Sequence, residues 1–103
     1  MTETVMPAGV LVRFFAAAQA SAGREQELIA WEQLSPTAAV ATLGALQRVL
    51  QERFPVSASE HTPDLASVLT HCSFLINGRS TKDPAQTITP GVQVDVLPPF
   101  AGG

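Results

Sequence analysis

The chain has 103 residues, 46% of them hydrophobic and 15% charged, so it is long enough for one globular domain with a single buried core. Its net charge of −3 and its scattered basic residues offer no basic surface for nucleic acid, and its single cysteine, Cys72, excludes an internal disulfide. No apolar run approaches the roughly 18 residues that span a bilayer, and residues 1–9 lack the basic and apolar regions of a secretory signal. We therefore expect a cytoplasmic protein that binds neither nucleic acid nor membrane.

The first part of the chain predicts a β-hairpin with a long connection. Residues 1–9 are interpreted as a flexible leader. Residues 10–16 (VLVRFFA) are rich in β-branched and aromatic side chains and predict a strand. Residues 17–24 are mostly small and polar and predict a turn, and residues 25–31 predict a second strand.

The clearest helix signal comes next. Ser35 and Pro36 combine a favoured N-cap residue with a proline at the first helical position. Apolar side chains then recur every three or four residues, which is the spacing of one face of an amphipathic helix. These residues are Val40, Leu43, Leu46, Leu50 and Phe54. Pro55 predicts the end of the helix.

The second half predicts a short helical turn and two or three strands. Asp64 is placed to cap a turn over residues 65–69. Residues 72–76 (CSFLI) predict a strand, and the Asn-Gly pair that follows them predicts a tight hairpin to a weak strand. Residues 92–97 (VQVDVL) alternate cleanly between apolar and polar side chains and predict the last strand.

This order of elements predicts an α+β protein with the β-grasp, or ubiquitin-like, fold. A single main helix after a hairpin must pack on one face of one mixed sheet. We expect a flexible leader over residues 1–9, a β-grasp domain over residues 10–97 and an extended tail over residues 98–103.

Alternation in the first and last strands divides their side chains between two faces. One set is entirely apolar and should face the helix: Val10, Val12, Phe14, Val92, Val94 and Val96. The other face carries Arg13 and Asp95 together with Phe15 and Leu97. We interpret Phe15 and Leu97 as an exposed apolar patch that binds a partner. The alternative is that isolated exposed apolar residues are ordinary features of a protein surface.

From the sequence, we expect that the domain has no catalytic residues of its own. His61, His71 and Cys72 are too few for a zinc site, and Cys72 is expected in the core. Glu25 and Glu27 are interpreted as the solvated face of an edge strand and not as a catalytic carboxylate pair. No glycine-rich phosphate loop is present, so we expect no metal and no stably bound cofactor.

The chain ends in a distinctive tail: Pro98, Pro99, Phe100, Ala101, Gly102 and Gly103. The prolines cannot extend a central strand and direct the chain away from the sheet. The two final glycines have no Cβ, so they form a thin arm that fits a narrow cleft. Fully extended, the four residues after Pro99 reach roughly 14 Å. We interpret the terminal carboxylate as a group that another protein modifies; the alternative is an ordinary frayed end.

Four segments resemble one known family: residues 12–23, residues 40–54, FLINGR at 74–79 and VDVLPPFAGG at 94–103. They are similar to the sulfur carriers typified by MoaD, the small subunit of molybdopterin synthase, and by ThiS of thiamine synthesis. The aromatic first strand, the alanine-rich segment after it and the length favour the MoaD branch. The sequence departs from the family at Pro90-Gly91, where Gly-Asp is frequent before the last strand.

The resemblance implies a cycle at Gly103. An E1-like, MoeB-like enzyme would adenylylate the carboxylate with ATP, and a sulfur donor protein would convert it to a thiocarboxylate. The tail would then enter a MoaE-like large subunit and donate sulfur to precursor Z (cyclic pyranopterin monophosphate) in molybdenum cofactor biosynthesis. The residues implied in tail insertion are Phe100, Ala101 and Gly102, and those implied in partner contact are Phe15, Leu97, Pro98 and Pro99.

The chain would then be the sulfur-donating, non-catalytic subunit of a two-subunit sulfurtransferase. Two alternatives remain open. The first is a carrier for thiamine or cysteine biosynthesis. The second is a ubiquitin-like modifier or a non-covalent β-grasp interaction module.

Overall fold

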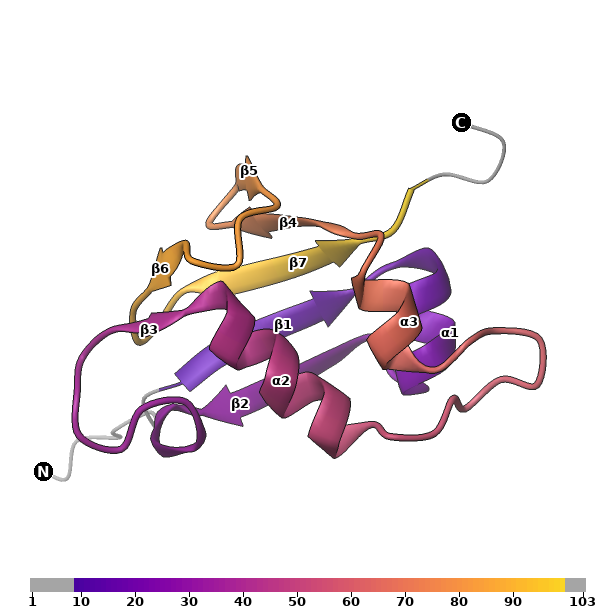
Figure 1. Ribbon diagram of the computed structural model, residues 1–103, viewed down its shortest axis with the longest axis horizontal. Coiled ribbons are helices and arrows are strands. Elements are labelled where there is room, and N and C mark those ends of the chain that lie inside the picture. The colour runs from indigo at the N-terminus through magenta and orange to yellow at the C-terminus, as the bar shows by residue number, and fades with distance from the viewer. Residues whose placement is uncertain (1–8, 100–103) are drawn as a thin grey trace, which may run out of the picture.

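A mixed five-stranded sheet forms the centre of the protein in a computed structural model, which describes residues 9–99 (Figure 1). Its strands are β1 (Gly9–Phe14), β2 (Gln26–Ala30), β4 (Ser73–Ile76), β5 (Arg79–Thr81) and β7 (Gln93–Leu97), in the order β2-β1-β7-β4-β5. The central strands β1 and β7 are parallel, and the other neighbouring pairs are antiparallel. The predicted β-grasp arrangement is confirmed, and its first and last strands are parallel neighbours at the centre of the sheet.

Helix α2 (Leu43–Arg53) lies across one face of this sheet and encloses the core (Figure 1). The alternation predicted for the two central strands is confirmed, because their apolar sets are buried beneath the helix. Buried residues of β1, α2 and β7 include Val10, Val12, Phe14, Leu43, Leu46, Leu50, Val94 and Val96. The rings of Phe14 and Phe54 meet edge to face, with centroids 5.7 Å apart, and close the core at the end of the helix.

The predicted start of this helix at Ser35-Pro36 is wrong, because α2 begins at Leu43. Thr42 is the N-cap, and its Oγ1 accepts a hydrogen bond from the Ala45 backbone N–H at 3.1 Å. The backbone N–H groups of Leu43 and Gly44 donate to carbonyls of the loop before β6, at 2.9 and 2.8 Å. A distant loop therefore satisfies the free donors of the first turn and fixes where the helix begins.

The residues just before α2 form a small second sheet. Strand β3 (Ala41–Thr42) pairs antiparallel with β6 (Thr87–Ile88). Val40, expected on the apolar stripe of the helix, precedes this ribbon and is exposed. Each strand has two residues, which is too short to produce a recognisable alternation in the sequence.

The predicted turn over residues 17–24 is also wrong, since most of it is helix α1 (Ala16–Ala22). Alanine has the highest helix propensity, and the segment is rich in it. Gly23 ends the helix in the left-handed conformation, with a φ of 77°, and its N–H donates to the Gln19 carbonyl at 2.8 Å.

Helix α3 (Leu65–Leu69) confirms the predicted short turn. The Asp64 side chain caps it by accepting a hydrogen bond from the Ser67 N–H at 3.0 Å, which lowers the pKa of Asp64. Helices α1 and α3 lie side by side at the end of the sheet where β1 and β7 terminate (Figure 1). None of the helices in residues 9–99 is long and apolar enough to cross a membrane.

Candidate docking surface

The sheet face opposite α2, here called the open face, carries several apolar side chains. Directly paired residues on neighbouring strands point to the same face of a sheet, so the register assigns Leu11, Leu28, Leu75 and Leu97 to this face. Leu28 is 46% exposed, whereas the other three are partly buried by their neighbours. The face therefore presents apolar surface that α2 leaves uncovered.

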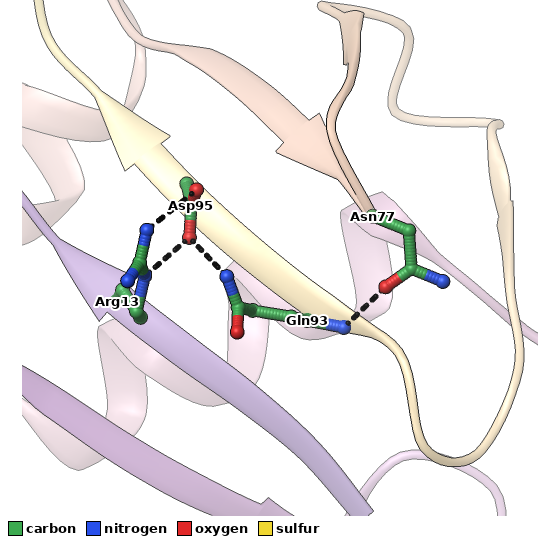
Figure 2. A network of polar contacts seen from close by, with 4 residues as sticks. All are labelled: Arg13, Asn77, Gln93 and Asp95. Atoms are coloured by element: carbon green, nitrogen blue, oxygen red, sulfur yellow. Dashed lines mark hydrogen bonds and ion pairs between the residues drawn. The ribbon is translucent and has the colours of Figure 1, made fainter.

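An ion pair lies at the centre of the open face. Arg13 on β1 and Asp95 on β7 are direct cross-strand partners. The Arg13 Nε and Nη2 atoms donate to Asp95 Oδ1 and Oδ2 at 2.9 and 3.2 Å, and Gln93 Nε2 donates to Asp95 Oδ1 at 3.2 Å (Figure 2). The hydrogen bond to Asp95, followed by its charge, raises the pKa of Arg13 above the ordinary value. The predicted placement of both residues on the open face is confirmed.

The Asn77-Gly78 turn supports this network from the neighbouring strand. Both residues have positive φ, 49° and 88°, as the predicted tight hairpin requires. Asn77 Oδ1 accepts a hydrogen bond from the Gln93 N–H at 2.9 Å (Figure 2). The Asn77 N–H also donates to the Gln93 carbonyl at 2.8 Å. The turn thereby fixes the start of β7, two residues before Asp95.

Phe15 lies beside the end of β7, as the sequence predicts. Its backbone N–H donates to the Val96 carbonyl at 3.2 Å, and its ring lies 5.3 Å from the Arg13 guanidinium carbon. The side chain is 37% exposed. Phe15 thus joins the ion pair of the open face to the strand end that leads into the tail.

The tail begins next to this surface. After Leu97 the chain leaves the sheet at Pro98 and Pro99, beside α1 and α3 (Figure 1). Pro98 is partly buried and Pro99 is exposed. Phe100, Ala101, Gly102 and Gly103, the residues predicted to be inserted or modified, lie outside the described residues.

The sequence of this chain matches the model of one known protein family. The model of the ThiS family matches residues 12–103, a span that includes the second half of β1, all of α2 and β7, and the tail sequence. The chain belongs to the ThiS family. The resemblance to MoaD/ThiS-like sulfur carriers seen in the sequence is confirmed at this level.

Solved structures show that the ThiS-family chain shares its fold with archaeal proteins. Two crystal structures from Haloferax volcanii are similar. One is described as SAMP1, with a TM-score of 0.67 and 21% identity over 92% of this chain and 99% of that one. The other, described as small archaeal modifier protein 1, has a TM-score of 0.65 and 20% identity over 90% and 99%.

A solution structure of the Haloferax volcanii HVO 2177 protein also matches the ThiS-family chain. It has a TM-score of 0.65 and 24% identity, and the match covers all of this chain and 94% of that one. No curated protein sequence gives a significant match. At these identities the structures establish the β-grasp fold, in agreement with the order of elements predicted from the sequence.

The ThiS-family chain keeps its only cysteine in the core. Cys72 is buried just before β4, and its Sγ donates to the Val68 carbonyl at 3.2 Å. Burial raises the pKa of Cys72 to about 11, which keeps the thiol protonated and unreactive near neutral pH. Among residues 9–99, no three His, Cys, Asp or Glu side chains converge to hold a metal ion, so His61, His71 and Cys72 are not brought together.

Iodoacetamide at pH 8 is expected to alkylate Cys72 far more slowly in the folded protein than in the denatured chain. Raising the pKa from 9.0 to about 11 lowers the thiolate fraction about 100-fold at this pH, and burial restricts access further. Mass spectrometry of timed samples measures both rates, with the urea-denatured protein as the reference. Equal rates would contradict the buried, protonated state.

Glu27 has a structural role that the sequence interpretation missed. Strand β2 is at the edge of the sheet as predicted, and Glu25 is exposed. Glu27, however, pairs with Val12 and lies on the helix side. Its carboxylate accepts hydrogen bonds from Arg24 Nη1 at 2.5 Å and from Arg53 Nε at 2.6 Å. Glu27 therefore links the end of α2 to β2. Residues two positions apart on a strand point to the same face, so the spacing from the buried Ile29 indicates the side on which Glu27 lies.

Proposed function

We propose that the protein is the sulfur carrier subunit of molybdopterin synthase. The Gly103 carboxylate would be adenylylated, converted to a thiocarboxylate, and would donate sulfur to precursor Z in molybdenum cofactor biosynthesis. The ThiS-family match through residue 103, together with the Pro-Pro-x-x-Gly-Gly ending, supports this proposal most strongly. The aromatic first strand and the alanine-rich α1 segment favour the molybdopterin branch.

The geometry suits a carrier that docks at one place and is chemically modified at another. The open face and the root of the tail adjoin at Phe15 and Leu97, so docking of this surface would bring the tail to a fixed point on the partner. Holding a reactive group near its target raises its effective concentration strongly. The proposed contact residues for the large synthase subunit are Phe15, Leu97, Pro98 and Pro99.

Partner enzymes would supply the bond-making steps. Ubiquitin-like sulfur carriers generally act with E1-like activating enzymes. In the first step, a Gly103 carboxylate oxygen attacks the α-phosphate of ATP and pyrophosphate leaves. The outer sulfur of a donor persulfide then attacks the carbonyl carbon, and AMP leaves. A thiol finally cleaves the S–S bond, so that the thiocarboxylate remains on Gly103 and the donor leaves as a disulfide. Activation is needed because a free carboxylate is a poor electrophile, whereas the acyl adenylate carries a good leaving group.

A second candidate is a ubiquitin-like protein modifier. It is favoured by the fold similarity to the structures described as SAMP1 and small archaeal modifier protein 1. This function would use the same tail and the same activation, but the Gly103 carbonyl would end in an amide bond to a lysine of the target. A carrier for thiamine or cysteine biosynthesis shares the tail chemistry as well.

Intact-mass spectrometry of the protein isolated from its own cells tests these functions. A carrier is expected to show a fraction heavier by one sulfur-for-oxygen exchange, because the thiocarboxylate accumulates before transfer. Copurification with a MoaE-like large subunit supports the molybdopterin route, whereas copurification with a thiazole or cysteine synthase supports another route. Peptides that join Gly103 to a lysine would instead support the modifier. The absence of both a heavier fraction and conjugates would contradict all of these assignments.

A further inference from the structure

Arg13 is the outward-facing charge of the open face. Among the strand residues that the register places on this face, Arg13 and Asp95 are the charged ones within residues 9–99. The Arg13 side chain is 42% exposed and that of Asp95 only 11%, so the guanidinium is presented to solvent and the carboxylate lies beneath it.

The ion pair leaves one edge of the guanidinium free. Arginine has five N–H donors in a planar arrangement with two forks. The fork that contains Nε is occupied, because Nε and Nη2 both donate to Asp95. Within residues 9–99, Nη1 has no acceptor. The remaining fork, formed by Nη1 and the second N–H of Nη2, has the geometry that binds a carboxylate through two hydrogen bonds.

The guanidinium is also held in position before any partner arrives. Asp95 fixes one edge, and Gln93 fixes Asp95 (Figure 2). The Phe15 ring lies against the guanidinium, 5.3 Å from its central carbon. A long side chain that is already ordered loses less conformational entropy on binding.

A partner that covers the open face must provide an acceptor for this free fork. Donors buried without acceptors would cost free energy, and the oxygens of Asp95 already accept three hydrogen bonds. The apolar residues around the pair favour a partner with a matching apolar surface. The whole chain has a net charge of −3, so an acidic partner group finds its favourable position at the positively charged Arg13.

We propose that Arg13 determines the specificity of the open face by binding, through its free fork, a carboxylate set in an apolar surface of the large synthase subunit. This inference rests on the proposed function, since it concerns the same docking surface. It adds the chemistry of the partner: an Asp or Glu side chain, surrounded by apolar residues, placed opposite the centre of the sheet.

The test uses calorimetric titration of the purified large subunit with the full chain and with two Arg13 variants. Arg13→Gln removes the charge and the fork, and Arg13→Lys keeps the charge alone. We expect Arg13→Gln to weaken binding at least about 10-fold at low salt, and Arg13→Lys to recover only part of this loss. When the salt concentration is raised from about 0.05 M to about 0.5 M, the affinity of the Arg13→Gln variant should also fall less than the affinity of the wild-type protein.

Arg79→Gln is the matched control, since it removes the same charge from an exposed residue on the edge strand β5. It should leave the affinity unchanged. A double-mutant cycle with the acidic residues of the large subunit, replaced one at a time by their amides, should find one that couples to Arg13. Circular dichroism melting checks that each variant is folded.

The outcomes separate this inference from the proposed function. Equal effects of Arg13→Gln and Arg79→Gln would overturn the role of Arg13 and leave the docking surface intact. Weaker binding by Arg13→Gln with unchanged salt dependence would assign the acceptor to a neutral carbonyl and overturn the carboxylate. If the wild-type protein itself does not bind the large subunit, the proposed function fails and this inference fails with it.

Discussion

Deletion of Gly103 is expected to abolish sulfur transfer and to leave the Tm of the protein nearly unchanged. The reaction requires a carboxylate at the end of a thin arm, and deletion moves that group back by one residue. The buried core is formed within residues 9–99, by α2 and the central strands, so stability should not depend on the last residue. A reconstituted transfer assay and a thermal melt measure the two effects on the same preparation.

Two further tail variants and one core variant sharpen this test. Replacing Gly102 by Phe should block entry into a narrow cleft, and residues appended after Gly103 should remove the free terminal carboxylate. Leu46→Ala is the matched control, because it creates a cavity beneath α2, should lower the Tm and should leave the tail chemistry intact. A large loss of stability in the Gly103 deletion would show that the tail is part of the core, which contradicts the proposed mechanism.

The central strands and the hairpin turn could be predicted from the sequence because their signals are local. Residues 10–14 and 92–97 alternate between a buried apolar set and an open set, and the parallel pairing of β1 with β7 puts both sets on common faces. Asn77-Gly78 adopts the positive φ angles that favour this pair of residues in tight turns. In these segments, local preference and tertiary structure agree.

The errors in the helices have non-local or weak local causes. Helix α2 begins at Leu43 because Thr42 caps it and because the loop before β6 accepts its first N–H groups, contacts that span about 40 positions in the sequence. Pro36 follows the local preference for proline at the first helical position, but the residues around it lack these contacts and form no helix there. Helix α1 consists largely of alanine, which forms helices well but gives no clear apolar periodicity.

The sequence predicts which residues share the face of the candidate site, but it does not predict which of them contact one another. Strand parity placed Arg13, Phe15 and Asp95 on one face, and the structure confirms this placement. The direct pairing of Arg13 with Asp95 depends on the register between two strands about 80 residues apart, which periodicity alone does not determine. Glu27 was misassigned because its polar character outweighed its position on the same strand face as Ile29.

Phe15→Asp and Leu97→Asp are each expected to weaken binding to the large synthase subunit at least about 30-fold, the scale of a hot-spot loss. Phe15 is 37% exposed and touches the Arg13 guanidinium, and Leu97 precedes the two prolines of the tail root. A partner that covers this patch would bury a charge where it now buries an apolar side chain. Both residues lie at the margin of the core, so both variants should remain folded, which circular dichroism can check.

Val56→Asp is the matched control, because Val56 is 79% exposed in the loop after α2 and lies outside the open face. It introduces the same charge and should leave binding unchanged, which separates loss of the patch from the general effect of one more acidic residue. Leu28→Asp, at the edge strand of the open face, measures how far the contact extends from the tail root. Calorimetric titration with the purified large subunit gives all four affinities. Unaltered affinity in both Phe15→Asp and Leu97→Asp would place the interface elsewhere on the protein.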